Sequence, residues 1–216
     1  PRLIEEYGLE GHLAAIGREA TGVVFASPLV QDGYRRFVAD GRATETIRPQ
    51  GSYTATPRDP ASRARLRREL GLASADRLVI NSGYADLRKG FDRFVQTAER
   101  LCTERPDVHF AWIGALSGDM RRWVADGVAH PDRIRLPGFT DDVAAWYSAA
   151  DAFYLSSRED PYPTVVLEAL NAELPVVVHA GASGFDALAA RFGLVVPNDA
   201  AGAVEGALLD VLDRDD

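Results

Sequence analysis

Two acidic side chains, Asp160 and Glu168, lie eight positions apart in a segment that joins a predicted strand to a predicted helix. Pro161 and Pro163 hold the turn between them. The helix directs its free N-terminal amides, around Thr164, toward the end of the strand, where a diphosphate would fit. Glu168 stands in an otherwise apolar Val-Val-Leu-x-Ala-Leu stretch, in which a carboxylate is costly unless it has a partner. Two adjacent ribose hydroxyls are a natural partner for it.

A second loop, residues 83–90, also ends a predicted strand and opens a predicted helix. Gly83 and Gly90 permit a tight turn and a close backbone approach, and Arg88 and Lys89 add positive charge. These features favour a phosphate, and the alternative is a plain strand-to-helix turn with exposed basic residues. Lys89 is the single lysine among 24 basic residues, and the others are arginines. The chain contains neither Gly-x-x-x-x-Gly-Lys-Ser/Thr nor Gly-x-Gly-x-x-Gly.

A parallel sheet is the element that would bring these two loops to one edge. From residue 77 onward, short apolar runs alternate with amphipathic stretches, the pattern of βαβ units with helices on both faces. We predict strands at 78–82, 109–113, 133–136, 152–156, 175–179 and 194–196, and helices at 90–104, 118–127, 141–149 after a Thr140 N-cap, 164–172, 184–191 and 200–212. This order predicts an α/β fold with a doubly wound, Rossmann-like parallel sheet, whose ligands bind beyond the carboxyl ends of the strands.

The first 52 residues follow a different pattern. We predict a helix at 3–14, a strand at 22–26 and a helix from Ser27, followed by the segment at 45–48. A single strand cannot bury both of its faces, so this part has to pack on something else. Residues 53–60 contain two prolines and no periodicity, as in a linker or hinge. The arginine-rich helix predicted at 62–70 and capped by Gly71 is either an anion-binding face or, as we favour, a solvated surface.

The composition excludes several classes of protein. The net charge of −8 and the pI near 5.1 argue against a large nucleic-acid surface. Cys102 is the only cysteine, which excludes a disulfide framework and a Cys-rich zinc site and favours a reducing compartment. We find neither a long apolar run nor a signal peptide, so we predict a cytoplasmic protein. Because the chain opens at Pro1 without an initiator methionine, we expect a fragment or a trimmed product.

From about residue 44 to the end, the sequence resembles the nucleotide-sugar-binding half of GT-B retaining glycosyltransferases, specifically glycosyltransferase family 4. That family carries an acid-x7-acid motif, usually Glu-x7-Glu, after the fourth strand of its C-terminal domain. Asp160 and Glu168 match this spacing, with Asp in the first place and Glu159 one position early. The resemblance implies that Glu168 holds the ribose, that Asp160 contacts hydroxyls of the donor sugar, and that the amides of Thr164 and Val165 lie near the diphosphate.

The loop at residues 83–90 is similar to the family's Gly-Arg-x-x-x-x-Lys-Gly phosphate loop. Gly83, Lys89 and Gly90 match, whereas Tyr84 stands where an arginine is common, and Arg88 is the candidate to compensate for it. A third segment resembles the part of the family's fold where the base lies against the backbone; its residues are Leu136, Pro137, Gly138 and Phe139. The resemblance therefore adds the base to the expected ligand.

The resemblance also divides the chain. Residues 1–52 look like the end of the N-terminal, acceptor-side GT-B domain with its hinge, and residues 53–216 like the nucleotide-sugar-binding domain. The family's important histidine lies in the part that this sequence lacks. We therefore expect His12, His109 and His130 at surface or strand-end positions, while His179, which ends the fifth predicted strand, faces the ligand edge. Three tryptophans are expected in the core; they are Trp112, Trp123 and Trp146.

The function implied is that of the donor domain of a retaining glycosyltransferase of the hexosyltransferase type, as in polysaccharide biosynthesis. It would take a UDP- or GDP-sugar, without a metal, and pass the sugar to a glycan or lipid acceptor held by the other domain, so this chain alone would be inactive. Membrane association stays open, with a peripheral position at the inner membrane face as one option. The alternative is a non-catalytic GT-B-like nucleotide-binding or assembly module, which Tyr84 and Asp160 would support. A GT-B sugar-nucleotide epimerase is disfavoured by the loop after residue 156.

Overall fold

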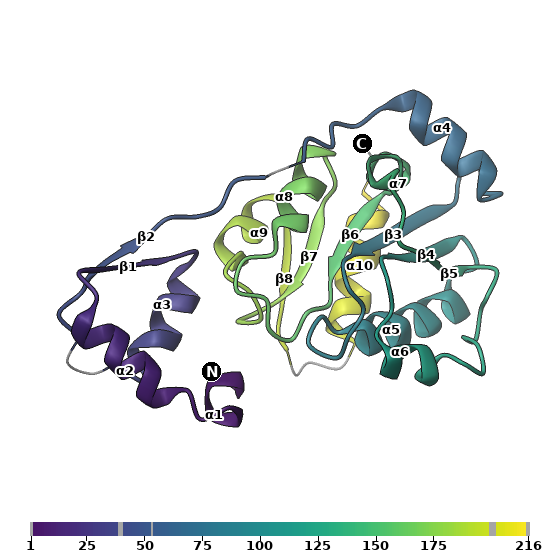
Figure 1. Ribbon diagram of the computed structural model, residues 1–216. Coiled ribbons are helices and arrows are strands. Elements are labelled where there is room, and N and C mark those ends of the chain that lie inside the picture. Colours follow the sequence, from purple (N-terminus) through teal and green to yellow (C-terminus); the bar gives the residue numbers. More distant parts are fainter. Residues whose placement is uncertain (1, 39–40, 53, 199–201, 215–216) are drawn as a thin grey trace. The chain divides into compact units, whose positions relative to one another are not determined.

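The computed structural model describes residues 2–38, 41–52, 54–198 and 202–214, and it divides into two compact units between Gly51 and Ser52. The elements of the first unit are α1 (Arg2–Glu6), α2 (Glu10–Glu19), β1 (Gly22–Phe25), α3 (Pro28–Arg35) and β2 (Thr44–Ile47) (Figure 1). The prediction of one helix at 3–14 was wrong, because the chain turns between α1 and α2, where Gly8 has a φ of 62°. The strand β1 pairs in parallel with β2.

The second unit carries a longer series of helices and strands. They are α4 (Pro60–Glu69), β3 (Arg77–Ser82), α5 (Phe91–Glu104), β4 (Val108–Ile113), α6 (Gly118–Trp123), β5 (Ile134–Gly138), α7 (Val143–Ala149), β6 (Ala152–Leu155), α8 (Thr164–Asn171), β7 (Val176–His179), α9 (Asp186–Phe192), β8 (Gly193–Val196) and α10 (Ala203–Leu212). The strands form one sheet in the order β5-β4-β3-β6-β7-β8, with every pairing parallel. The predicted doubly wound α/β sheet is confirmed.

The strand order reverses at the centre of this sheet. From β3 the chain runs outward through β4 to β5, returns to place β6 beside β3, and then runs outward again through β7 to β8. In open parallel sheets the crevice for a ligand lies at such a reversal, beyond the carboxyl ends of the strands. The loops that follow β3 and β6 are residues 83–90 and 156–163, the two segments that carry the candidate site.

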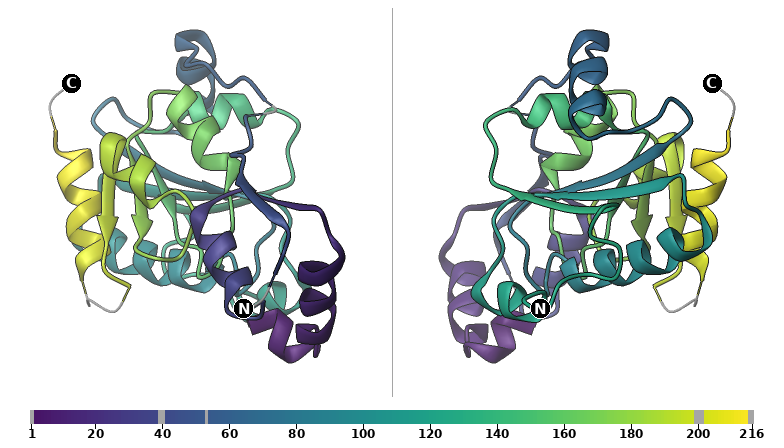
Figure 2. Two further views of the ribbon diagram at one scale, coloured as in Figure 1. Left: turned by 90° about the vertical axis from the view of Figure 1, so that its left-hand side faces the viewer. Right: turned by 90° about the vertical axis from the view of Figure 1, so that its right-hand side faces the viewer.

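Each face of the sheet builds its own hydrophobic core, because successive strand residues point to opposite sides. Leu78 and Ile80 of β3 lie in the core that α4, α7, α8 and α9 complete, whereas Val79 lies in the core formed with α5, α6 and α10. All three side chains are fully buried. Figure 2 shows helices on both sides of the sheet. The strand ends between these two layers are thereby held rigidly.

Several predicted boundaries need correction. The helix α6 ends at Trp123 rather than at 127, and Trp123 is 45% exposed, whereas Trp112 and Trp146 are buried as expected. Thr140 is not an N-cap, because α7 begins at Val143 and the Thr140 hydroxyl instead accepts a hydrogen bond from the amide of Asp142. The strand β5 continues to Gly138, and the start of the helix predicted at 200–212 lies outside the described residues.

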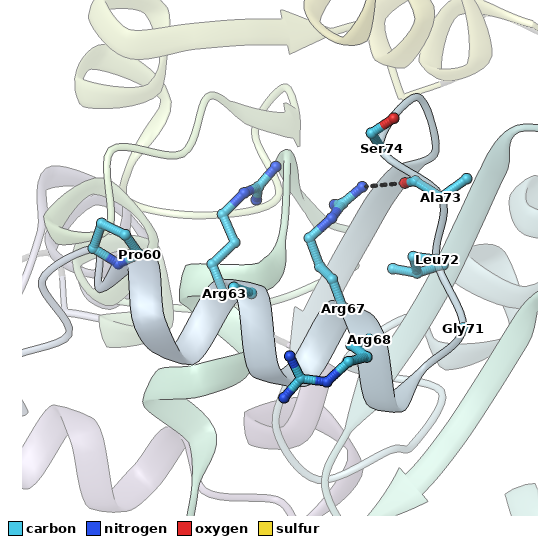
Figure 3. A pocket seen from close by; sticks show the side chains of 9 residues that line it. Pro60, Arg63, Arg67, Arg68, Gly71, Leu72, Ala73 and Ser74 are labelled. Atoms are coloured by element: carbon cyan, nitrogen blue, oxygen red, sulfur yellow. Dashed lines mark hydrogen bonds between the residues drawn. The ribbon is translucent and has the colours of Figure 1, made fainter.

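The arginine-rich helix α4 packs its inner arginines against α7. The guanidinium of Arg63 donates to the carbonyls of Ser148, Ala149 and Ala150, at 3.2, 2.8 and 2.8 Å. Arg63 and Arg67 also form ion pairs with Asp151, at 2.6 and 3.0 Å. A groove of about 650 Å³ lies between α4 and residues 71–74. Figure 3 shows Arg63, Arg67 and Arg68, which are among the residues that line it. The solvated surface that we favoured therefore describes only part of this helix.

Candidate functional site

Lys89 and Asp160 come together across the reversal of the strand order. The ammonium of Lys89 forms an ion pair with the Asp160 carboxylate, although the two residues are 71 positions apart. Asp160 is only 5% exposed, and its amide donates to the carbonyl of Ala182 at 2.8 Å. The loops that follow β3, β6 and β7 are thus joined at a single point, with one positive and one negative side chain at the junction.

The loop after β3 is built to hold Lys89 in place. The Asp86 carboxylate accepts a hydrogen bond from the amide of Lys89 at 2.6 Å, and the Ser156 hydroxyl donates to the Lys89 carbonyl at 3.2 Å. Gly90 has a φ of 71°, and a Cβ there would lie 2.0 Å from the carbonyl oxygen of Ser156. Only glycine permits this approach of the loops after β3 and β6. The role of Gly90 is therefore to bring the two loops together.

The candidate base segment lies at the ends of three neighbouring strands. The amide of Gly83 donates to the carbonyl of Ile113, and that of Gly114 to the carbonyl of Gly138, both at 2.8 Å. Gly83 and Gly138 have φ values of 139° and 77°. Leu136 is half-buried, whereas the ring of Phe139 is 77% exposed, and Tyr84, after β3, is 55% exposed. This edge of the sheet therefore presents two aromatic rings to solvent.

Arg88 and Arg158 tie the two central loops together. The Arg88 guanidinium donates to the carbonyl of Glu159 at 3.0 Å, and the Arg88 carbonyl accepts from the amide of Arg158 at 2.8 Å. Arg158 forms two hydrogen bonds with the carboxylate of Asp92, at 2.6 and 2.7 Å. Arg88 itself is exposed. Of the two cations singled out in residues 83–90, only Lys89 reaches Asp160.

Glu168 lies in α8, and it is partly buried. Pro163, which precedes Thr164 and Val165 at the start of this helix, supplies no side-chain cap. The Glu168 carboxylate accepts a hydrogen bond from the hydroxyl of Tyr147 at 3.0 Å. Burial raises the pKa of Glu168, and the hydrogen bond from Tyr147 opposes that rise. The buried carboxylate thus has a protein partner.

Sequence reasoning missed Tyr147 and Thr56, the two residues that hold Glu168. The Thr56 hydroxyl donates to the Glu168 carbonyl at 2.7 Å, and the Thr56 amide donates to the Asn171 side chain at 2.6 Å. Thr56 falls within the segment predicted as a linker, yet it is fully buried. The available signal for Tyr147 was its hydroxyl, which requires a partner when a tyrosine is buried in a helix of otherwise small and apolar residues.

The expectation that His179 faces the ligand edge was wrong. His179 is only 7% exposed, and its Nε2 lies 2.9 Å from the hydroxyl of Tyr154. Burial lowers the pKa of His179 to about 4, so the ring stays neutral. His179 ends β7, and its partner Tyr154 lies in the neighbouring strand β6.

His109, His130 and Asp186 have partners within the fold, which for His130 are Thr103, at 2.9 Å, and Arg133, at 3.0 Å. His109 is buried near the start of β4, and it lies between Arg135, at 3.0 Å, and Asp76, at 3.4 Å. The Asp186 carboxylate accepts a hydrogen bond from the amide of Gly181 at 2.7 Å. In the part of the chain that the structure describes, no three His, Cys, Asp or Glu side chains cluster as a metal site would require. Among the same residues, no helix is long and apolar enough to cross a membrane.

The arrangement suits a ligand that carries both phosphate and adjacent hydroxyls. One ammonium, at Lys89, and the positive end of the α8 dipole can attract an anion. The carboxylate of Glu168 has the acceptor oxygens that a pair of hydroxyls requires.

Comparison with known proteins supports this interpretation. The chain is 33% identical over 125 residues to the alpha-galactosylglucosyldiacylglycerol synthase of Streptococcus pneumoniae, covering 53% of this chain and 31% of that protein. It is 33% identical over 138 residues to a D-inositol 3-phosphate glycosyltransferase of Pseudarthrobacter chlorophenolicus, covering 61% of this chain and 33% of the relative. The matched region is thus about a third of the length of these relatives.

Solved structures share the fold. Anabaena Alr3699/HepE in complex with UDP superposes with a TM-score of 0.78 at 18% identity, over 97% of this chain and 58% of that one. WaaG, a glycosyltransferase involved in lipopolysaccharide biosynthesis, gives a TM-score of 0.75 at 20% identity, over 88% and 53%. The fold is that of the C-terminal half of GT-B glycosyltransferases. The family model described as Glycosyl transferases group 1 matches residues 76–214, and the chain belongs to that family.

Proposed function

We propose that this chain is the donor-binding half of a retaining glycosyltransferase that takes its sugar from a nucleoside diphosphate sugar. The observation that carries the proposal is the ion pair where the strand order reverses between Lys89 and Asp160, which lies in the loop that leads into α8, the helix of Glu168. A nucleoside diphosphate has an anion and a ribose diol, and the site offers a group suited to each. The family assignment makes sugar transfer the chemistry that such a ligand would serve.

Each group of the site takes one part of the donor. Lys89 and the amides at Thr164 and Val165 hold the diphosphate, and Glu168 accepts hydrogen bonds from the ribose hydroxyls. The segment at residues 136–139 and the exposed ring of Tyr84 flank the base. Asp160 shares Lys89 with the diphosphate and turns its other carboxylate oxygen to the donor sugar.

The transfer would proceed on one face of the sugar. The oxygen of the acceptor hydroxyl forms a bond to the anomeric carbon while the bond from that carbon to the diphosphate breaks, and the bonding electron pair stays on the leaving oxygen. The acceptor proton passes to an oxygen of the departing diphosphate. Because the new bond forms on the face from which the diphosphate leaves, the configuration is retained. Lys89 and the helix amides stabilise the charge that develops on the diphosphate, with no metal ion required.

The substrates are proposed from the relatives. Anabaena Alr3699/HepE has been solved with UDP and with UDP and glucose, which makes UDP the first nucleotide to test, with GDP as the alternative. The name of the pneumococcal relative contains a diacylglycerol, which makes a lipid acceptor one candidate beside a glycan. We propose that the acceptor is held by the other half of a full-length protein located in the cytoplasm or peripherally at the membrane.

Calorimetric titration of the chain with UDP, GDP and UMP tests the proposal. We expect one of the two diphosphates to bind in a 1:1 complex and UMP to bind at least about tenfold more weakly, because it lacks the second phosphate that Lys89 would contact. If neither UDP nor GDP binds, or if UMP binds as tightly as UDP, the site is not a diphosphate site.

A second candidate function is a non-catalytic nucleotide-binding module. It is favoured by Tyr84 in place of an arginine and by the engagement of Asp160 with Lys89. The full-length protein separates the two: transfer of radiolabelled sugar from the donor supports the enzyme, and tight nucleotide binding without transfer supports the module. The isolated chain is expected to bind and not to transfer.

A further inference from the structure

The hydroxyl of Tyr147 lies at the centre of a small polar cluster in an otherwise apolar layer. Its oxygen is 3.0 Å from the carboxylate of Glu168 and 3.3 Å from the carbonyl of Val165, and the side chain of Ser82 forms a further hydrogen bond with it. Ser82 is the last residue of β3, directly before Gly83. The cluster thus connects the loop after β3 with the carboxylate in α8.

The Tyr147 hydroxyl acts as a donor to Glu168. Tyr147 is fully buried, and burial together with the neighbouring carboxylate of Glu168 raises its pKa well above the ordinary value. The phenol therefore keeps its proton. Ser82 can donate to the phenol oxygen, and the phenol proton then goes to the charged Glu168 carboxylate, at 3.0 Å, in preference to the Val165 carbonyl, at 3.3 Å. The hydrogen bonds thus run from the hydroxyl of Ser82, through that of Tyr147, to the carboxylate of Glu168.

The backbone of Glu168 is held separately. Its carbonyl accepts the hydroxyl of Thr56, which is fully buried, while its carboxylate accepts the hydroxyl of Tyr147. A glutamate has three rotatable side-chain bonds, so an anchored backbone alone does not orient its carboxylate. The bond from Tyr147 restricts that freedom.

We infer that Tyr147 is a positioning residue that aims the Glu168 carboxylate at the ribose and thereby sets the preference for a ribonucleotide over a 2′-deoxyribonucleotide. The inference rests on the proposed function, because it takes Glu168 as the acceptor of the ribose hydroxyls. A carboxylate fixed by one donor has its remaining lone pairs directed to a defined place, which strengthens the two hydroxyl contacts.

The experiment compares dissociation constants for UDP and 2′-deoxy-UDP, or for the guanosine pair if GDP is the nucleotide that binds. We expect the unaltered chain to prefer the ribonucleotide by about 10-fold or more. Tyr147→Phe keeps the ring in the core and removes only the hydroxyl, and we expect it to lower this preference by about 3- to 10-fold. Affinity for the deoxynucleotide should fall by a smaller factor than affinity for the ribonucleotide, since it keeps only the 3′-hydroxyl of the two that would contact Glu168.

One variant serves as the control. Tyr154→Phe removes the hydroxyl of another fully buried tyrosine, whose partner is His179. We expect it to keep the preference of the unaltered chain. Loss of the preference in this control as large as in Tyr147→Phe would show a general loosening of the fold and overturn the inference. Because the preference is a ratio measured on the same folded protein, a small loss of stability leaves it unaffected.

Glu168→Gln separates the inference from the proposed function. If the unaltered chain shows no preference, or if Glu168→Gln retains it, the proposed ribose contact is wrong. If Glu168→Gln abolishes the preference while Tyr147→Phe retains it in full, the inference about Tyr147 is wrong and the proposed function stands.

The pH dependence gives a further readout that a merely structural role would not change. Protonation of Glu168 removes an acceptor, so the preference is lost as the pH falls through the raised pKa of Glu168. Without the Tyr147 hydroxyl the pKa of Glu168 rises further, and the loss should begin at a higher pH in Tyr147→Phe. An unshifted profile would overturn the inference.

Discussion

The helix α4 and the loop after β3 are both positively charged, and they use that charge in opposite ways. The arginines at positions 63 and 67 reach carbonyl groups at the C-terminal end of α7 and the carboxylate of Asp151. The loop after β3 carries a single lysine, which is paired with Asp160, a residue that precedes the first residue of α8 by four positions. The arginines of α4 therefore stabilise the fold, whereas the single lysine after β3 belongs to the candidate site.

The orientation of the nearest helix explains the difference. A helix ends in unpaired carbonyls that attract cations, as at α7, whereas it begins with unpaired amides that attract anions, as at α8. A cation beside carbonyls is already neutralised, but a cation beside amides adds to their attraction for a phosphate. The number of basic residues in a segment is thus a poor guide to an anion site.

The largest expected effect is on the free energy of unfolding, and it tests the structural role of the arginines in α4. Arg67→Met leaves the Asp151 carboxylate with one partner fewer in a site where both side chains are nearly buried. We expect the free energy of unfolding to fall by about 3 to 5 kcal/mol, while the dissociation constant for UDP is unchanged. Urea denaturation and calorimetry measure the two quantities. A loss of nucleotide affinity in the folded variant would contradict the separation of the two regions.

A pair of glycines provides the next test, since one lies in each region. Gly71, after α4, and Gly90, after β3, have nearly the same φ, 69° and 71°, but only a Cβ at Gly90 would meet another atom, the Ser156 oxygen. We expect Gly71→Ala to cost about 1 to 2 kcal/mol of stability. Gly90→Ala should cost about 1 to 3 kcal/mol more, because the loops must separate.

Nucleotide binding provides the control for this pair. Gly90→Ala should weaken UDP binding because Lys89 is the neighbouring residue, whereas Gly71→Ala should leave it unchanged. Equal stability losses in the two variants, measured by urea denaturation, would mean that the close approach at Gly90 is unimportant.

The third prediction concerns the two adjacent cations of the loop. Lys89→Ala should weaken UDP binding by about 10- to 100-fold, the value of a hydrogen bond to a charged group. Arg88→Ala should weaken it by no more than about threefold, because the Arg88 guanidinium is exposed and is bonded to the Glu159 carbonyl. Calorimetric titration of both variants with UDP tests this prediction. A larger loss of affinity in Arg88→Ala than in Lys89→Ala would assign the phosphate contact to Arg88 instead.

The smallest expected effect is that of salt. Raising sodium chloride from about 0.05 to 0.5 M should weaken UDP binding by roughly threefold, because charges within reach of solvent are screened. The stability contributed by Arg67 and Asp151 should change little, since their side chains are about nine-tenths buried. The dissociation constant for UDP and the free energy of unfolding are measured over the same series of salt concentrations. If the free energy of unfolding depends more steeply on salt, the ion pairs of α4 are more exposed to solvent than the candidate site.

Much of the fold was predictable because it depends on local patterns. Runs of apolar residues with intervening amphipathic stretches predicted every strand of the six-stranded sheet, with boundaries that differ by one or two residues. The helix pair α1 and α2 was predicted as one helix, since the pattern does not show that the chain turns near Gly8. Boundaries at Thr140 and after Trp123 also failed, because caps and helix ends depend on contacts outside the segment.

The sequence by itself determined which residue types stand at the strand ends: a glycine-bounded loop with one lysine, and two acids eight positions apart before and within a helix. These are local facts, set by spacing along the chain. Only the tertiary structure decided that Lys89 pairs with Asp160, that Tyr147 holds Glu168, and that His179 is buried against Tyr154. The residues of these pairs are 71, 21 and 25 positions apart, and the order of the strands, which no local pattern specifies, brings them together.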